Sequence, residues 1–229
     1  MLFIAASLQA TTYDLTTALD ANSSNSNPFG VWSLLNGTTV MSYLTGGSCG
    51  EAGLGLNYYA STARAGSPCP ASVSVATGSG PSSVFQSGDI IAYSSDAPSV
   101  GLFIDWTAPV AGTITVSGDI WYAHPSVSRS NNFTLALGGT TLATGTVAYN
   151  SGYTRSSPDT FSGGGPLAVA AGEVLSLEII QTPPGAIDTG NFDGVDVSVT
   201  ETPAAGSTPE PRTVLLLGSA LGLARLSHF

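Results

Sequence analysis

Hydrophobic and polar residues alternate with a period of two in several short segments of the chain, which is the main sequence signal for β-strands. In residues 112–122, Ile114, Val116, Ile120 and Tyr122 share one face, while mostly threonine, serine and aspartate occupy the other. The same alternation recurs in residues 102–106, 133–137, 174–180 and 195–201. We therefore predict a strand in each of these segments, with one face in the core and one in water.

Turn residues separate these predicted strands. Pro109 to Gly112 form a turn signal, and Gly138-Gly139 is a hairpin signal. Several strands joined by short turns favour an all-β fold, an antiparallel β-sandwich of the jelly-roll kind, over residues 13–201. We place an early strand of the same sandwich in the segment S-N-P-F-G-V-W-S, residues 26–33, and a long glycine-rich loop at residues 46–80.

Composition agrees with this fold and excludes some partners. With 229 residues, 42% hydrophobic residues and 28 glycines, the chain can bury a core and make many turns. It has no lysine, and 5 arginines face 15 acidic residues, for a net charge of −10. Binding to nucleic acid or to anionic membrane surfaces requires clustered cations. We therefore expect no nucleic-acid partner.

The two cysteines, Cys49 and Cys69, lie in sequence rich in glycine, serine and proline. A zinc site would need more ligands, and the internal histidine, His124, is far away in the sequence. In an exported protein we predict a disulfide between them, which would contribute roughly 3 kcal/mol by restricting the unfolded chain. The alternative is two unpaired small residues in loops.

The first twelve residues are an apolar run that ends in small residues, with Ala10 as a cleavage-site residue. This is the pattern of a signal peptide without its basic start, because no lysine or arginine precedes Arg64. We predict a truncated signal peptide-like segment over residues 1–12. The alternative is an ordinary first strand that continues through Tyr13 and Leu15.

The end of the chain contains a linker, residues 202–208, followed by Pro209-Glu210-Pro211, an apolar run and Arg225. The apolar run is shorter than the roughly 20 residues that span a bilayer as a helix. The order of motif, hydrophobic run and basic residue resembles the PEP-CTERM sorting tail, here residues 209–229. A buried C-terminal helix of the domain is the alternative.

The resemblance implies a bacterial protein that is exported, anchored briefly in the inner membrane and processed by the transpeptidase exosortase. The final location would be the cell surface or the extracellular matrix. The sorting motif would be Pro209, Glu210 and Pro211, with Arg225 standing for the basic cluster. The short hydrophobic helix would contain Val214, Leu215, Leu216, Leu217, Leu221 and Leu223.

The body of the chain is similar to the sugar-binding-like β-sandwich modules that often precede such tails. The similarity lies in residues 106–118, 170–177 and 191–200. It implies a fold and an association with extracellular polysaccharide. Related tails also occur in ice-binding proteins, which makes ice an alternative ligand.

Sugar binding uses exposed aromatic rings as flat platforms. The candidates are Trp121, on the face opposite Ile120 and Tyr122, and the pair Tyr58-Tyr59. A role for these rings as a second layer of the core is the alternative.

One segment is a candidate cation site. Apart from a calcium ion there, we expect the protein to use no cofactor. Asp188, Asn191, Asp193 and Asp196 place four oxygen-bearing side chains within nine residues, and oxygen ligands suit calcium. Turn chemistry explains aspartate and asparagine beside glycine equally well.

Catalytic patterns are weak. His124 and Asp119 could be drawn into a serine triad, but no G-x-S-x-G motif accompanies them. A glycosidase needs two carboxylates in one cleft, for which the strand acids are candidates: Asp105, Asp119, Glu178 and Asp196. We predict a protein that is not an enzyme. The alternatives are a secreted polysaccharide hydrolase and a purely structural matrix protein.

Overall fold

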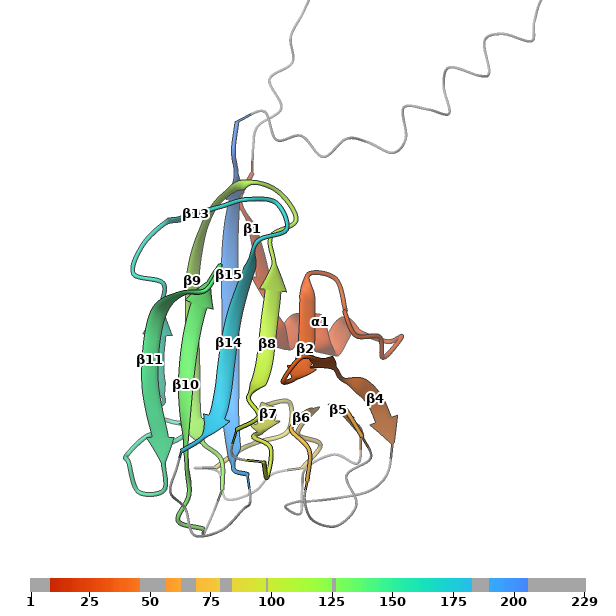
Figure 1. The fold of residues 1–229 in the computed structure, drawn as a ribbon, viewed down its shortest axis with the longest axis vertical. Helices are drawn as coiled ribbons and strands as arrows, with labels where there is room; N and C mark the ends of the chain where they lie inside the picture. The colour runs from red at the N-terminus through yellow and green to blue at the C-terminus, as the bar shows by residue number, and fades with distance from the viewer. Residues whose placement is uncertain are drawn as a thin grey trace, which may run out of the picture.

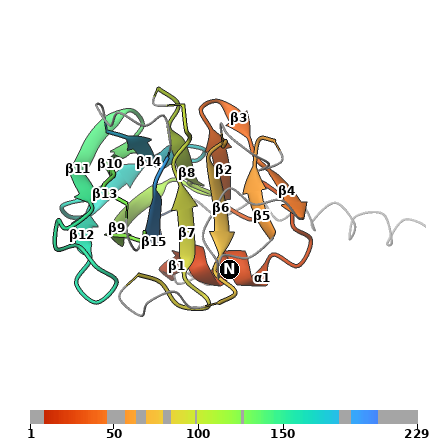
Figure 2. The same ribbon diagram turned by 90° about the horizontal axis from the view of Figure 1, so that it is seen from below.

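A computed structural model describes residues 9–45, 57–62, 69–78, 84–97, 99–124, 127–182 and 190–205. Two antiparallel sheets stack face to face as a β-sandwich, seen as two layers in Figure 2. The prediction of an all-β sandwich is confirmed. The predicted C-terminal hydrophobic helix lies outside these residues. Within them, no helix is long and apolar enough to cross a membrane.

The first sheet has six strands, and its long central strands run side by side in Figure 1. Their spatial order is β11 (Thr140–Ala148), β10 (Ser130–Leu137), β14 (Val174–Gln181), β8 (Leu102–Thr107), β2 (Trp32–Asn36) and β3 (Thr39–Val40).

The second sheet has nine strands. Its main path is β12 (Asp159–Ser162), β9 (Gly112–Tyr122), β15 (Phe192–Pro203), β7 (Ile90–Tyr93), β6 (Ser72–Val75), β5 (Asn57–Ala60) and β4 (Ser42–Thr45). Off this path, β1 (Thr11–Asp14) pairs with β15 and β13 (Leu167–Val169) pairs with β9.

The alternating segments form the strands that were predicted, namely β8, β9, β10, β14 and β15. Their apolar faces meet between the sheets, where Trp106, Leu135 and Val199 are fully buried. The predicted hairpin joins β10 to β11 through Gly138 and Gly139, whose φ angles of +54° and +84° suit glycine.

The N-terminal boundary differs from the prediction. Thr11 and Thr12 pair with β15, so the sandwich begins two residues before the predicted start. After β1 the chain forms a short helix, α1 (Leu15–Ala21), which the sequence did not indicate. Asp14 caps this helix by accepting a hydrogen bond from the Thr17 backbone N–H at 2.8 Å, and Leu15 is fully buried.

The prediction of one long loop over residues 46–80 is wrong, because β5 and β6 lie within it. Both strands are short and lie on the path between β7 and β4. Strand β6 reads Ser-Val-Ser-Val, and even its serines Ser72 and Ser74 are buried. Its sequence does alternate, but over only four residues within sequence rich in glycine and serine, so the alternation does not stand out as a strand.

The early strand predicted over residues 26–33 overlaps β2 only at Trp32 and Ser33, because β2 begins at Trp32 after a turn. Asn27, in the segment before β2, is bonded to it. The Asn27 amide donates to the Leu34 and Met41 carbonyl oxygens, each at 2.8 Å, and its Oδ1 accepts from the Leu34 N–H at 3.0 Å. One side chain thereby joins β2 to the segment that leads into β4.

We predict that Asn27→Ala lowers the free energy of unfolding by about 2–4 kcal/mol, because three partly buried hydrogen bonds are lost. Urea denaturation followed by tryptophan fluorescence measures this change. Thr38→Ala, at an exposed turn position, is the control and should change stability by less than about 0.5 kcal/mol. Equal stability of the two variants would contradict the role given to Asn27.

Candidate functional site

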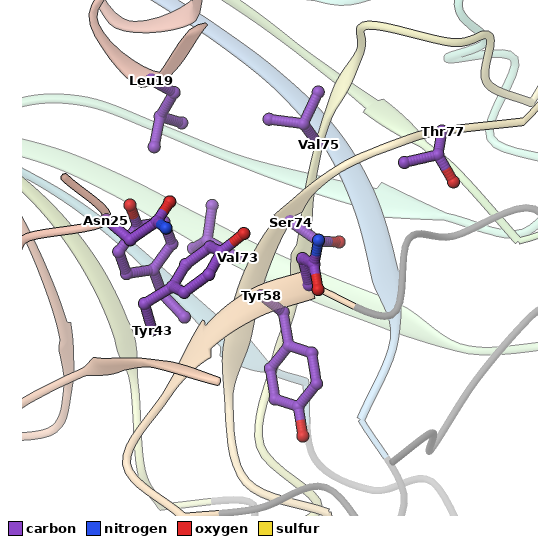
Figure 3. A pocket seen from close by; sticks show the side chains of 10 residues that line it. Leu19, Asn25, Tyr43, Tyr58, Val73, Ser74, Val75 and Thr77 are labelled. Carbon is purple, nitrogen blue, oxygen red and sulfur yellow. The ribbon is translucent and has the colours of Figure 1, made fainter. Parts of the chain in front are cut away.

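The tyrosine pair predicted to contact carbohydrate lies on β5. Tyr58 is 1% exposed and Tyr59 is 5% exposed, so neither ring is an open platform. Successive side chains of a strand point to opposite faces. Figure 3 shows the Tyr58 ring directed away from Leu19, Val73 and Tyr43. Of the predicted pair, only Tyr59 therefore presents its ring on the side of the sheet where these residues lie.

A pocket of about 190 Å³ adjoins this pair, and we call it the tyrosine pocket. Its aliphatic wall consists of Leu19, Val73 and Val75 (Figure 3). Tyr43, on the neighbouring strand β4, lies directly opposite Tyr59. The two rings meet edge to face, with centroids 5.2 Å apart and planes at 65°. Tyr43 is only half-buried, and sequence reasoning missed it.

Helix α1 and the turn after it form another wall of the tyrosine pocket. Asn22, at the C-terminal end of the helix, donates to the Tyr59 hydroxyl oxygen at 2.6 Å. Burial raises the pKa of Tyr59, so this hydroxyl stays neutral. Asn25 lines the pocket with a φ angle of +54°, which side chains other than glycine adopt rarely. The turn thus holds Asn25 beside Tyr43 (Figure 3) in a left-handed conformation, which asparagine tolerates better than most residues other than glycine.

The polar part of the lining is uncharged. It includes the amides of Asn25 and Asn57 and the hydroxyl of Thr77, while the Ser74 side chain points to the other face of β6 from Val73 and Val75. Asn57 and Thr77 are exposed and lie at the rim, whereas Ser74 is buried. The tyrosine pocket therefore combines an aromatic ring, an aliphatic wall and neutral hydrogen-bonding groups.

Trp121 is a core residue in place of the exposed platform that the sequence predicted. It is 6% exposed, and its Nε1–H donates to the Val84 carbonyl oxygen at 2.7 Å. Its cross-strand neighbour is Gly194. A Cβ atom at Gly194 would lie 1.9 Å from Cε2 of the indole. The glycine between Asp193 and Val195 therefore makes room for the ring.

Of the residues predicted to bind calcium, Asn191 and Asp193 are in contact, but Asp196 lies on the other face of the sheet. Asp193 and Asp196 are three positions apart on β15, so their side chains point to opposite faces. Asp193 is completely buried, while Asp196 is exposed on the outer face. Asp188 lies outside the described ranges. Within those ranges, no group of three or more histidine, cysteine, aspartate or glutamate residues could hold a metal ion.

Asp193 instead belongs to a buried network of amides. Asn131 donates to its Oδ2 at 2.5 Å, and the Asn191 side chain donates to its Oδ1 at 3.1 Å. Ser94 donates to Asn131 Oδ1 at 2.9 Å and accepts from the Asn191 backbone N–H at 2.9 Å. Burial holds the pKa of Asp193 well above its usual range, because the two amides compensate only part of the desolvation of the charge.

The four carboxylates considered for glycosidase chemistry lie on opposite sides of the sandwich. Asp105 and Glu178 are on the outer face of the six-stranded sheet. Asp119 and Asp196 are direct cross-strand partners on the nine-stranded sheet. These two line adjoining hollows of about 350 and 330 Å³. Burial, and then the negative charges of Asp14 and Asp119, raise the pKa of Asp196.

The remaining predicted residues are placed as follows. His124 is buried and stacks on Phe192, with ring centroids 6.0 Å apart, whereas Asp119 lines the outer hollows. Cys69 is buried. Cys49 lies outside the described residues, so its pairing with Cys69 stays a prediction. The sorting residues Pro209, Glu210, Pro211 and Arg225 and the apolar run 214–223 also lie outside them.

No family model and no curated protein matches the chain. Among solved structures, it is similar to a family 35 carbohydrate binding module from Clostridium thermocellum, with 11% identity, a TM-score of 0.31 and coverage of 83% of this chain and 97% of the module. It is also similar to a xylan-binding CBM22-1 domain from Paenibacillus barcinonensis, with 12% identity, a TM-score of 0.31 and coverage of 76% of this chain and 94% of that domain. A third similar structure is a Stig cyclase, Fisc, from Fischerella sp. TAU, with 13% identity, a TM-score of 0.39 and coverage of 86% of this chain and 100% of the cyclase. At these scores the similarities carry no argument about activity.

We predict a pH dependence of stability from Asp193. Because its folded pKa is raised, the folded state holds a proton that the unfolded chain releases above a pH of about 4. The free energy of unfolding therefore falls as pH rises from about 4 to the folded pKa. Asp193→Asn lacks this slope, so its stability relative to the original protein should increase across that window.

Urea denaturation between pH 4 and 8 measures the difference, with the exposed Asp20→Asn as the control that keeps the original slope. If the original protein instead gains stability over Asp193→Asn with rising pH, Asp193 is ionised in the fold and a positive partner, such as a cation, neutralises it.

Proposed function

We propose that the protein is a non-enzymatic, exported bacterial surface or matrix protein whose β-sandwich binds extracellular polysaccharide through the tyrosine pocket. The arrangement of Tyr43 carries the proposal. Its ring is partly open to solvent, is held by the buried Tyr59 and faces a pocket with an aliphatic wall and neutral polar groups.

Sugars match this combination of groups. A pyranose ring has apolar faces that pack on aromatic rings, and its hydroxyls exchange hydrogen bonds with amides and hydroxyls. The rigid sheet also limits the entropy lost on binding, because Tyr59 is fixed by Asn22 and by the ring of Phe29 at 6.0 Å. Tyr43 is thus oriented before any ligand arrives.

One observation favours a second function, the hydrolysis of polysaccharide. Asp119 and Asp196 are adjacent carboxylates on one open face, and the raised pKa of Asp196 separates its environment from that of an ordinary surface acid. Paired carboxylates of this kind serve glycosidases as acid and base. Burial, followed by the negative charges of Asp14 and Asp119, explains the raised pKa of Asp196 without any catalytic role, so we rank this function second.

We predict that Tyr43→Ala weakens binding to the host's extracellular polysaccharide about tenfold, because the exposed aromatic contact is lost. Affinity gel electrophoresis measures the dissociation constant. Tyr149→Ala is the matched control, since Tyr149 is also partly exposed, at 38%, but does not line the tyrosine pocket. It should bind like the original protein.

Unchanged binding by Tyr43→Ala, or an equal loss in both variants, would remove the tyrosine pocket from the proposal. The same samples are assayed for release of reducing sugar. Release that disappears in Asp119→Asn would establish the hydrolase in its place, and absence of both binding and release would leave a structural matrix protein.

The proposed export rests on the sorting tail. We predict that the full chain is processed and found at the surface or in the matrix of its host, whereas a chain truncated after Thr208 is not retained there. Exosortase would recognise Pro209, Glu210 and Pro211 while the apolar run is briefly in the inner membrane. Cell fractionation with immunoblotting measures size and location of both forms.

A second variant, Glu210→Gln, tests the motif itself because it leaves the apolar run intact, and it should lose processing as the truncated chain does. If all three forms stay in one compartment at unprocessed size, the sorting proposal is wrong, while binding through the tyrosine pocket stands or falls separately.

A further inference from the structure

The chemistry of the tyrosine pocket restricts the kind of sugar that it can hold. Among the described residues that line it, none carries a charge. Its polar groups are amides and hydroxyls, such as those of Asn25, Asn57 and Thr77. A carboxylate or sulfate that entered would lose water without meeting a cation, and transfer of an unpaired charge is strongly unfavourable. The net charge of −10 repels an anionic ligand further.

The size of the tyrosine pocket restricts the ligand as well. Its volume of about 190 Å³ is below the roughly 300 Å³ at which pockets for drug-sized ligands begin. One six-membered ring with its hydroxyls is a ligand of suitable size, and a run of several sugars is too large. The two hollows around Asp119 and Asp196, at about 350 and 330 Å³, are larger but acidic.

The walls of the pocket are fixed from two sides, which favours recognition of one defined ring. Tyr59 is held by the hydrogen bond from Asn22 at 2.6 Å. Asn25 lies three residues after Asn22 in a turn, and its backbone N–H donates to the Asn22 carbonyl oxygen at 3.0 Å. Its positive φ angle is a conformation kept in place by the surrounding structure, as at many ligand sites.

We infer that the tyrosine pocket holds a single uncharged pyranose, the terminal sugar of a neutral glycan, and rejects uronic acids. This inference rests on the proposed binding of polysaccharide and specifies its ligand. The sugar ring packs on Tyr43, and its hydroxyls bond to the asparagine amides. The remaining glycan extends into solvent past the exposed Asn57 and Thr77 at the rim.

The test measures competition between bound polysaccharide and free methyl glycosides by isothermal titration calorimetry. The probes are methyl glucoside, mannoside, galactoside and xyloside, and the methyl glycosides of glucuronic, mannuronic and galacturonic acid. At least one neutral glycoside should compete. Its counterpart with a carboxylate at carbon 6 should bind at least about tenfold more weakly at pH 7, and Tyr43→Ala should abolish competition.

A charge-insertion variant tests the reason for the selectivity. Asn25→Lys supplies the missing cation and should raise the ratio of uronate to neutral affinity about tenfold. Asn150→Lys is a matched control, because Asn150 is an exposed asparagine with a similar φ of +60° but does not line the pocket. Both replacements place a lysine at a position of positive φ, so the control reports the effect of backbone strain and of an added charge away from the pocket.

Three outcomes would overturn the inference. If polysaccharide binds through Tyr43 but no monosaccharide glycoside competes, the pocket reads an internal part of a chain, and the proposed function survives without this inference. If uronates bind as well as neutral glycosides, the exclusion of charge is wrong, again without harm to the proposed function. If neither neutral nor acidic polysaccharide binds at all, the proposed function fails, and the inference fails with it.

Discussion

The pairing of β15 with three other strands is the constraint on which the rest of the sandwich depends. β15 pairs with β9 from Asp193 to Pro203, with β1 along its second half and with β7 along its first residues. Its period of two directs Val195, Val197 and Val199 into the core. The same register buries Asp193 among amides and leaves Asp196 outside next to Asp119, so it determines both the buried network and the acidic outer face.

The tyrosine pocket depends on β15 in two ways, through β7 and through β1. Through β7, the sheet continues to β6, β5 and β4, where Tyr43 lies opposite Tyr59. Through β1, β15 positions helix α1, whose C-terminal turn brings Asn22 and Asn25 to the same tyrosines. A neutral pocket at one edge of the sheet and a carboxylate pair near its centre are therefore separate features, and the proposed binding uses only the first.

The sequence predicted the parts of the fold in which apolar and polar positions contrast. Strands β8, β9, β10, β14 and β15 each have one wet face, and alternation located them. It did not reveal β5 and β6, because each strand has only four residues and their flanks are rich in glycine and serine. The main consequence is that part of the candidate site could not be predicted. Tyr58 and Tyr59 were noticed as a pair, but Tyr43 becomes significant only once strand register places it across from Tyr59.

Binding of a neutral glycan at the tyrosine pocket is what connects this fold to the proposed function. Titration of the isotopically labelled protein with a neutral oligosaccharide, followed by amide chemical shifts in two-dimensional NMR spectra, tests it most directly. We expect the largest shifts on β4, β5 and the turn that contains Asn25. Shifts concentrated instead on Ser117, Asp119 and Asp196, on the outer face of the sheet, would contradict it.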